Sequence, residues 1–468
     1  MSLFYSGLLI FDYFAVIYFF LVNGTYLFLN IKAFFSIKKY WRAREIMEFE
    51  NMFQSEFYKP VSIIIPAYNE ELTIVDNIIS ILSLQYPEYE LVVVNDGSKD
   101  ATIEELKDKF NLVVSSRSYR NEIGTQPIKE VYDSTDYPNL VVVDKENGGK
   151  ADALNAGINI AQFPLVCNVD ADSLIDDQAL LKIVEPFARD WRVVAAGGTI
   201  RVANDCEIRG GQVKKVRLAK KPLVRMQVLE YLRAFLFGRV GWAALNSLLI
   251  ISGAFGVFKR KHLINAGGYS TDTVGEDMEL VLKLNRKLKK AKREYRVVFF
   301  ADPVCWTQVP EDIGTLSNQR RRWQRGLGQS LMMNRELFFN KEYGRLGLLA
   351  YPFFFFVEFL GPVIETFGYL AIILTIFLQS GIPTVAVLFF ITAILMGILL
   401  SIISLLFEEM TFRKYDKLSD KLSLVLYAFL ENFGYKQLHT FWRLRGIIDL
   451  LLKKESWGAQ KRKNFSND

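Results

Sequence analysis

Carboxylates follow apolar, strand-like runs at several points in the middle of this chain. Asp96 comes soon after Leu91–Val94, while Asp170 and Asp172 come directly after Leu165–Val169. In an α/β sheet, ligands bind outside the carboxyl ends of the strands, so these side chains are expected to meet at one edge. Carboxylate oxygens hold divalent cations, and a carboxylate can also act as a general base. The pattern predicts metal-assisted or acid–base chemistry there.

Two further motifs bring a third acidic position and a mixed cationic and aromatic face. Asp277 lies at the start of the helix-like stretch Met278–Leu284. Gln319, Arg322 and Trp323 fall at i, i+3 and i+4, which is one face of a helix. An amide, a planar cation and an aromatic ring suit phosphate groups and sugar rings. Together the motifs indicate a transferase that uses a nucleotide sugar.

The order of the motifs is more specific than any one of them. They follow one another as Asn95–Ser98, Asp170–Asp172, Glu276–Asp277 and Gln319–Trp323. With Ile63–Glu70 before them and apolar segments on both sides, the chain resembles the membrane-bound, processive branch of glycosyltransferase family 2. That branch includes the synthases of cellulose, chitin, hyaluronan and poly-N-acetylglucosamine. The resemblance covers Lys59–Met333 and the flanking membrane segments.

The resemblance implies a GT-A fold and a role for each matching residue. Asp172 is the main ligand of Mg²⁺ or Mn²⁺, with Asp170 beside it, and Asp277 is the catalytic base. Gly253 and Trp323 bind the acceptor. The nucleotide-sugar-binding residues are Tyr68, Asn69, Glu70, Asp96, Lys150, Gln319 and Arg322. A single displacement then inverts the sugar, so an α-linked donor gives a β-linkage.

Several of these motifs also have purely structural explanations. Asp96 can belong to a turn followed by a helix cap, and Asp170–Asp172 can be a solvent-exposed acidic turn. Glu276 suits the positive end of a helix whatever else it does. The small residues around Gly253 can form a packed turn.

Two basic segments have competing explanations as well. Asn147–Lys150 precedes a helix at Ala151, where small residues let the backbone approach an anion, but it can also be an ordinary loop. The helix with Gln319 can rest on lipid through Arg320, Arg321 and Arg325.

The amino-terminal segment predicts a membrane anchor. Apart from Asp12, Asn23, Thr25 and Asn30, Leu8–Ile31 is apolar, and at about 1.5 Å per residue it reaches about 36 Å. That length crosses a hydrocarbon core of about 30 Å. Basic residues follow it from Lys32 onward and none precedes it. The segment is therefore a retained anchor rather than a signal peptide, with the central domain in the cytoplasm.

Composition narrows the chemistry. Three cysteines among 468 residues offer neither a disulfide framework nor a zinc cluster, and two histidines argue against a His-ligated metal or a Ser-His triad. Acid–base work then falls to Asp or Glu. The formal net charge of +6 suits contact with anionic membrane lipids. Nucleic-acid binding would need basic residues interleaved with aromatics on one face, and the sequence shows no such stripe.

The central region alternates between strand-like and helix-like stretches. The predicted strands are Val61–Ile65, Leu91–Val94, Leu140–Val143 and Leu165–Val169. The predicted helices are Glu71–Leu84, Ala101–Phe110 and Ala151–Gln162. Continuous apolar strands separated by helices favour a doubly wound, mostly parallel α/β sheet. Residues 115–138 lack periodicity and are expected to be irregular.

The carboxyl-terminal part predicts a return to the membrane. Leu346–Leu378 is expected to be an interfacial or broken helix followed by a span, and Thr384–Leu406 a second span. Residues 421–452 are expected to form one amphipathic helix in the membrane interface. The predicted domains are 1–35 (transmembrane), 36–58 (a cytosolic linker or a helix lying on the membrane), 59–310 (GT-A), 311–345 (interfacial), 346–410 (interfacial and transmembrane) and 411–468 (amphipathic tail).

These expectations add up to a multi-pass protein of the cell inner or plasma membrane. It transfers a sugar from UDP-N-acetylglucosamine or UDP-glucose to a growing β-linked exopolysaccharide, as in biofilm synthesis, with export through the membrane. Few spans leave only a narrow channel unless chains associate, as a homo-oligomer or with an accessory membrane subunit. The alternatives are a glycosyltransferase that adds one sugar to a lipid, and a catalytically idle pore or scaffold. The tail is too short for a PilZ-like regulatory domain.

Overall fold

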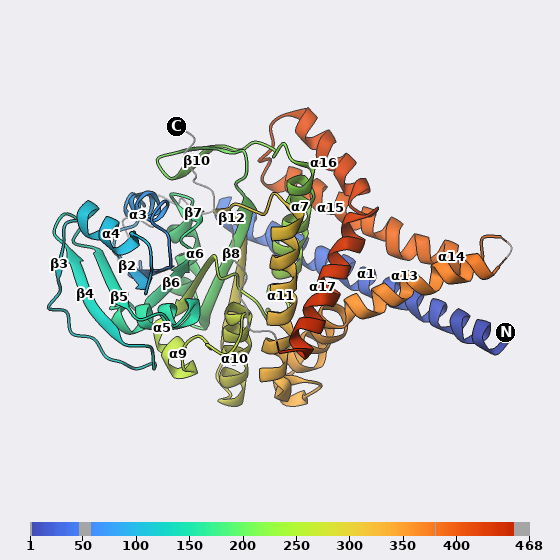
Figure 1. Ribbon diagram of the computed structural model, residues 1–468, viewed down its shortest axis with the longest axis horizontal. Coiled ribbons are helices and arrows are strands. Elements are labelled where there is room, and N and C mark those ends of the chain that lie inside the picture. Colours follow the sequence, from blue (N-terminus) through green and yellow to red (C-terminus); the bar gives the residue numbers. More distant parts are fainter. Residues whose placement is uncertain (1, 46–57, 380, 454–468) are drawn as a thin grey trace.

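The computed structural model describes residues 2–45, 58–379 and 381–453. Figure 1 shows an α/β domain on the left and an arm of long helices on the right, with the amino terminus at the far end of the arm. The predicted class, an α/β domain with flanking apolar helices, is confirmed.

The main sheet has ten strands within the described residues, in the order β3-β4-β5-β2-β1-β6-β11-β8-β12-β7. A separate hairpin pairs β9 (Glu207–Arg209) with β10 (Gln212–Lys215). The ten strands are β1 (Val61–Ala67), β2 (Tyr89–Asp96), β3 (Leu112–Val114), β4 (Ile128–Ser134), β5 (Leu140–Lys145), β6 (Leu165–Val169), β7 (Ser173–Ile175), β8 (Val193–Val202), β11 (Phe255–Lys259) and β12 (Arg296–Thr307).

The centre of the sheet positions the acidic motifs. Strands β5, β2, β1 and β6 run parallel to one another, so their carboxyl ends lie at the same edge. Successive side chains of a strand point to opposite faces. Ile63 and Ile65 accordingly join the core beneath α3, α4 and α6, while Ile64 joins the core beneath α5, α9 and α10. These helices are α3 (Ile74–Leu82), α4 (Thr102–Lys109), α5 (Lys150–Ile160), α6 (Ala179–Arg189), α9 (Arg260–Ala266) and α10 (Glu276–Lys290).

The sheet departs from the sequence prediction at its flanks. Strand β11 runs antiparallel to both β6 and β8, so the sheet is mixed rather than mostly parallel. Residues 115–138 are not wholly irregular, because they contain β4, which pairs antiparallel with β3 and β5. Only Val131 and Ser134 of β4 are buried, which explains why its apolar pattern is too weak to predict a strand.

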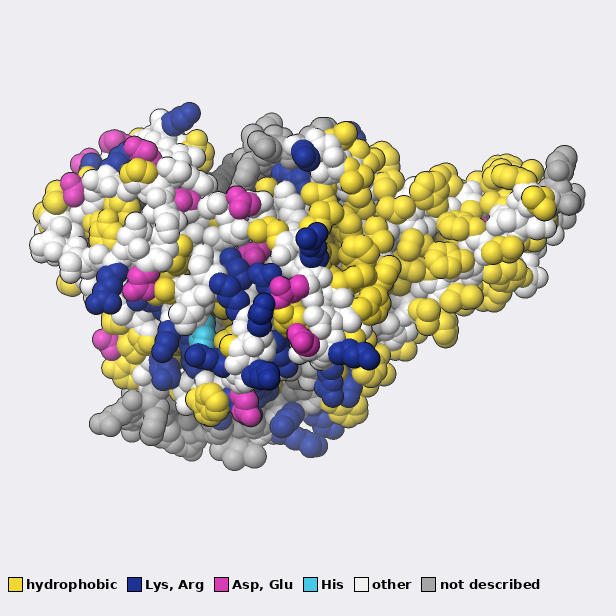
Figure 2. Space-filling view, turned by 90° about the horizontal axis from the view of Figure 1, so that it is seen from below, with side chains coloured by type: hydrophobic (Ala, Val, Ile, Leu, Met, Phe, Trp, Pro, Cys, Tyr) yellow, Lys and Arg dark blue, Asp and Glu magenta, His cyan; other side chains and the backbone are white. Residues whose placement is uncertain are grey.

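The arm contains helices of membrane-spanning length. Three helices in the described residues are long and apolar enough to cross a bilayer, in agreement with the predicted number: Leu3–Arg42, Gly361–Leu378 and Thr384–Thr411. They belong to α1 (Ser2–Glu45), α13 (Gly361–Leu378) and the continuous run of α14 (Thr384–Phe389), η6 (Phe390–Leu395) and α15 (Met396–Thr411). Hydrophobic side chains cover the arm in Figure 2.

The helix of the anchor extends past its predicted end. Helix α1 continues to Glu45, so residues 36–45 belong to it rather than to a linker. Lysine and arginine are good helix formers and suit the carboxyl end of a helix, which accounts for the extension. The rest of the predicted linker, up to residue 57, lies outside the described residues.

The carboxyl-terminal segments connect the domain to the arm. The Gln319–Trp323 motif lies on α11 (Ile313–Met333). Residues 421–452 form two helices rather than one, α16 (Leu418–Leu430) and α17 (Tyr435–Leu451), separated at Gly434 with φ 103°. Helix α17 lies along α11 (Figure 1), where Asp449 pairs with Arg321 and Arg443 donates to Gln324, while its placement in the membrane interface stays a prediction. The remaining helices are α7 (Pro222–Tyr231), η1 (Leu232–Arg239), α8 (Val240–Ala244), η2 (Arg335–Leu337), η3 (Lys341–Tyr343), η4 (Leu346–Ala350), α12 (Tyr351–Phe353) and η5 (Phe354–Phe359).

Candidate active site

A cavity of about 1700 Å³ opens at the carboxyl ends of β1, β2 and β6 and continues between the helices of the arm. It gathers residues that are far apart in the sequence. Every residue predicted for the site lines it: Tyr68, Asn69, Glu70, Asp96, Lys150, Asp170, Asp172, Gly253, Asp277, Gln319, Arg322 and Trp323.

Lys150 lies at the centre of an acidic cluster in this cavity. Its ammonium group is 2.5 Å from Oδ1 of Asp170 and 3.7 Å from Oε1 of Glu276. Burial alone would lower the pKa of Lys150, but Asp170 and Glu276 raise it above its ordinary value. Lys150 therefore stays charged and holds carboxylates from the end of β6 and the start of α10 together.

The carboxylates in the cluster repel one another. Burial raises the pKa of Asp172 to about 6, and the charge of Asp170 adds to the rise while Lys150 opposes it. Burial also raises the pKa of Glu276 to about 7, where Lys150 opposes the rise and Asp277 adds to it. Such crowding is the setting that a bound divalent cation relieves.

Asp277 is oriented by backbone groups at the start of α10. Its Oδ2 accepts a hydrogen bond from the amide of Gly253 at 3.1 Å, and its Oδ1 accepts one from the amide of Met278 at 2.8 Å. A Cβ atom at Gly253 would lie 3.1 Å from Nζ of Lys150 and 3.7 Å from Cβ of Asp277. The glycine thus lets its strand-connecting loop approach the acidic cluster closely.

A pair of glycines brings α10 against α11. A Cβ atom at Gly326 would lie 2.8 Å from the backbone nitrogen of Gly275, and one at Gly275 would meet the backbone of Gly326 at the same distance. Neither neighbour is a flexible side chain, so the close approach requires both glycines. This contact sets Asp277 opposite the Gln319–Trp323 face.

Gly326→Ala is expected to destabilise the protein by about 1–3 kcal/mol, because it overpacks this crossing. In an open helix the same change would instead stabilise by about 1 kcal/mol. Thermal unfolding of the purified protein measures the difference. Gly314→Ala, on the same helix, is the control, since its Cβ would meet only a side-chain oxygen of Asp312. Equal unfolding temperatures for the two variants would contradict the overpacking.

Asp96 organises a neighbouring loop. Its carboxylate accepts hydrogen bonds from the amides of Gly148 at 3.0 Å and Gly149 at 2.7 Å, and from Nζ of Lys145 at 2.6 Å. The side chain of Asn147 donates to the carbonyl of Asp96 at 2.7 Å. The amides of these small residues therefore bind a carboxylate of the protein itself, and the approach of a ligand anion to this loop stays a prediction.

The segment after β1 is tied to the loop after β2. The amide of Asn69, at φ 56°, donates to Oγ of Ser98 at 3.0 Å, and Oδ1 of Asn69 accepts from the amide of Lys99 at 2.8 Å. Glu70 is buried. Tyr68 differs, since it lines the cavity and is 41% exposed. Of Tyr68, Asn69 and Glu70, the tyrosine is best placed to contact a ligand.

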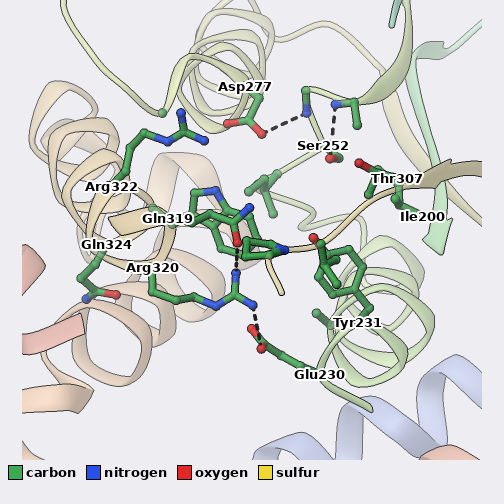
Figure 3. A pocket seen from close by; sticks show the side chains of 18 of the residues that line it. Ile200, Glu230, Tyr231, Ser252, Asp277, Thr307, Gln319, Arg320, Arg322 and Gln324 are labelled. Carbon is green, nitrogen blue, oxygen red and sulfur yellow. Dashed lines mark hydrogen bonds and ion pairs between the residues drawn. The ribbon is translucent and has the colours of Figure 1, made fainter. Parts of the chain in front are cut away.

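Helix α11 presents the predicted face to the cavity. Asp312 caps it by accepting a hydrogen bond from the amide of Thr315 at 2.8 Å. In Figure 3, Arg322 points toward the side of the cavity that holds Asp277. Its charge also lowers the pKa of Asp172. Trp323 is 43% exposed.

The arginines beside this face do not rest on lipid. Arg320 is almost fully buried and lies 2.8 Å from Oε2 of Glu230, and Arg321 lies 2.7 Å from Oδ2 of Asp449. Arg325 is buried as well. The lipid-resting alternative for these three residues is therefore wrong.

Comparison with known proteins decides the family. Residues 62–243 match the model of glycosyl transferase family 2. Residues 165–404, more than half of the chain, match the model of glycosyl transferase family group 2. The chain belongs to this family. Its α/β domain is accordingly a glycosyltransferase domain of the GT-A fold.

Two relatives from staphylococci share part of this glycosyltransferase chain. It is 31% identical over 267 residues to a poly-β-1,6-N-acetyl-D-glucosamine synthase of Staphylococcus epidermidis, which covers 57% of this chain and 54% of the relative. It is 30% identical over 269 residues to the synthase of the same name from Staphylococcus aureus strain COL, with the same coverage. The chain thus matches about half the length of these curated relatives.

Among solved structures, a mannosyltransferase from Pyrobaculum calidifontis in complex with GDP-Man and Mn²⁺ is similar over 93% of this chain and all of its own. The TM-score is 0.49 and the sequence identity 18%.

Sequence reasoning missed three residues of this glycosyltransferase site. Lys145 is fully buried between Asp96 and Asp152, at 2.6 Å from each. A lysine that ends a continuous apolar strand is the signal that could have found it. Glu276 pairs with Lys150, which also pairs with Asp170, although the position of Glu276 at a helix start suggested only an interaction with the helix dipole. Glu230 lies in no motif, and nothing in the sequence points to it.

Proposed function

We propose that this chain is an inverting, processive glycosyltransferase that moves a sugar from a UDP-sugar to a growing β-linked polysaccharide. One observation carries the proposal. A single cavity joins the Asp172 and Asp277 carboxylates to the Gln319–Trp323 face and then continues between the helices of the arm. Donor, acceptor and product can thus share one space.

The chemistry of transfer falls to Asp277. An acceptor hydroxyl attacks the anomeric carbon of the donor, the bond from that carbon to the diphosphate breaks, and UDP leaves. The hydroxyl proton passes to the carboxylate of Asp277, which hydrogen bonds from Gly253 and Met278 hold in place. Attack opposite the leaving group inverts the anomeric carbon.

The two aspartates that follow β6 fit a divalent cation. Asp170 and Asp172 supply hard oxygen donors, and their mutual repulsion favours a bound cation. No cluster of three or more potential metal ligands occurs in the described part of the chain, so the diphosphate and water would complete the shell. Mg²⁺ or Mn²⁺ held there would neutralise the leaving diphosphate. Arg322 and Gln319 add a cation and an amide for the same group.

For the donor, we propose UDP-N-acetylglucosamine ahead of UDP-glucose. The name of the staphylococcal relatives supports this order. Membranes containing the protein are incubated with each labelled UDP-sugar, and label in product is counted against membranes containing the Asp277→Asn variant. Incorporation from UDP-N-acetylglucosamine is expected, and incorporation from UDP-glucose alone would overturn the choice of donor.

The cavity between the arm helices supports export of the product. Polar side chains line this part of the cavity. Oη of Tyr26 donates to Oε1 of Glu358 at 2.5 Å, and Oγ1 of Thr440 donates to Oε2 of Glu365 at 2.6 Å. Arg443 lies 3.2 Å from Oε2 of Glu358. Hydroxyl-rich sugars can exchange hydrogen bonds with such groups. Polar residues facing a cavity inside a membrane commonly mark a substrate path.

Trp323→Ala is expected to shorten or abolish the polymer without preventing UDP binding. An aromatic face can stack on the terminal sugar at every cycle, whatever the length of the chain. Product sizing and UDP affinity are measured for Trp323→Ala, Trp323→Phe and the control Trp191→Ala. Trp191 is 71% exposed and lies outside the cavity. Full-length polymer from Trp323→Ala would contradict this role.

A glycosyltransferase that adds one sugar to a lipid remains the rival function. The same acidic site would serve it, but it has no need of a polar cavity that continues past the acceptor face. Product size separates the two functions.

A further inference from the structure

Trp323, the proposed acceptor platform, has one face already covered. The guanidinium carbon of Arg320 lies 4.3 Å from the centroid of the indole ring, a cation–π contact. Arg320 is 1% exposed, whereas Trp323 is 43% exposed. A sugar can therefore stack only on the opposite face of the ring. The arginine fixes both the plane of the platform and the side on which it is available.

Arg320 is itself held by groups on two sides. Its Nη2 donates to Oε2 of Glu230 on α7 at 2.8 Å, and its Nη1 donates to Oε1 of Gln319 at 2.8 Å. Figure 3 shows this chain of contacts from Glu230 through Arg320 to Gln319. The chain joins the buried carboxylate to two members of the motif, since Gln319 and Trp323 both contact Arg320.

Glu230 also receives groups from α17. Oη of Tyr435 donates to its Oε2 at 2.9 Å, and Nε2 of His439 lies 3.5 Å from its Oε1. Burial by itself raises the pKa of Glu230, but Arg320 and His439 outweigh burial and hold that pKa well below its ordinary value. The carboxylate is therefore charged at neutral pH and is shared by three helices.

A buried guanidinium needs its counter-charge. Removing one partner of a buried ion pair leaves the other charged and uncompensated, which drives it to rearrange. Without Glu230, the guanidinium of Arg320 is expected to move toward the cavity, where water can solvate its charge. The stack on Trp323 then loses its fixed geometry. The effect on the acceptor passes through Arg320 and the indole ring.

We propose that Glu230 is a positioning residue for the acceptor, which holds Arg320 against Trp323 so that the terminal sugar stacks in one register at each cycle. This inference rests on the proposed polymerase function and adds to it. It also makes α17 part of the acceptor site through Tyr435 and His439. The base Asp277 takes no part, and one hydrogen bond, from Arg320 to Gln319, connects the platform to the proposed donor pocket.

The competing explanation is that Glu230 merely braces α11 against α17. The chain contains a matched control for it. Asp449 on α17 pairs with Arg321 on α11, the residue next to Arg320, at 2.7 Å. Asp449→Asn removes a partly buried ion pair between the same two helices but leaves the stack on Trp323 intact.

The test measures product length, donor KM and UDP affinity for Glu230→Gln, Arg320→Lys and Asp449→Asn in the full-length membrane protein. Lysine keeps the charge at position 320 but lacks the planar group that stacks. Mean product length is expected to fall about fivefold in Glu230→Gln and in Arg320→Lys, the size of one cation–π contact. Product length should fall by a larger factor than donor affinity, since Arg320 contacts the donor side through one hydrogen bond, to Gln319. The product of the double variant Glu230→Gln/Arg320→Lys should be no shorter than the product of either single variant.

Two results would overturn the inference. Product of normal length from Glu230→Gln, or equal shortening by Asp449→Asn, would leave Glu230 as a brace only. If Glu230→Gln does not fold, Arg320→Lys decides the question in the same way. Product of normal length from Arg320→Lys would show that the stack on Trp323 does not set product length. Failure of the underlying function is distinguished by the unmodified protein, which would then make no polymer at all.

Discussion

Asp277→Asn is expected to lower the rate of sugar transfer by about 10²–10⁴-fold, the usual cost of removing a general base. Asparagine keeps the size of the side chain and can still accept a hydrogen bond from the amide of Gly253, but it cannot take the proton of the acceptor hydroxyl. Donor binding should change little, because only the acceptor side is disturbed. The measurement is UDP release under saturating donor, together with UDP affinity.

A control for this variant lies just before it in the chain. Asp272→Asn removes an exposed carboxylate that does not line the cavity, so its turnover should match that of the unmodified protein. A large loss of donor affinity in Asp277→Asn, combined with intact turnover, would remove Asp277 from the catalytic role.

Asp172→Asn is expected to abolish transfer and to weaken divalent-dependent UDP binding. The fold should survive, because the change removes a buried charge that Asp170 repels. Burial and the charge of Asp170 both raise the pKa of Asp172. The measurement is UDP affinity with and without Mg²⁺ or Mn²⁺, alongside turnover and thermal unfolding. The stimulation of UDP binding by metal should disappear in the variant.

Asp176→Asn is the matched control for the metal site. Asp176 follows β7, lies outside the cavity and is 3.7 Å from Nζ of Lys182. Metal-stimulated UDP binding should persist in it. Near-normal turnover by Asp172→Asn would show that the cation, if one is used, is held elsewhere.

The sequence predicts the parts of this site that depend on local pattern. Continuous apolar strands place Asp96, Asp170 and Asp172 at one sheet edge, because parallel strands end on the same side. Helical spacing puts Gln319, Arg322 and Trp323 on one face. Hydropathy identifies the three long apolar helices of the arm. The roles of these residues stay predictions, although the structure brings all of them to one cavity.

What the sequence does not predict depends on partners that are distant in the chain. Asp96 binds Gly148 and Gly149, and Arg320 binds Glu230, contacts that no local pattern encodes. Helix α17 is amphipathic in sequence, but the pattern does not show that Arg443 and Asp449 bind Gln324 and Arg321 of α11. Edge strand β4 escapes prediction for a different reason, since a half-buried strand has a weak apolar pattern.

Product size under excess donor tests the central claim most directly. Purified protein in lipid vesicles is supplied with labelled UDP-N-acetylglucosamine and Mg²⁺ or Mn²⁺, and the product is sized after extraction with organic solvent. We predict water-soluble material many sugars long that is absent from Asp277→Asn. Label found only in an organic-extractable lipid carrying a single sugar would contradict the polymerase function.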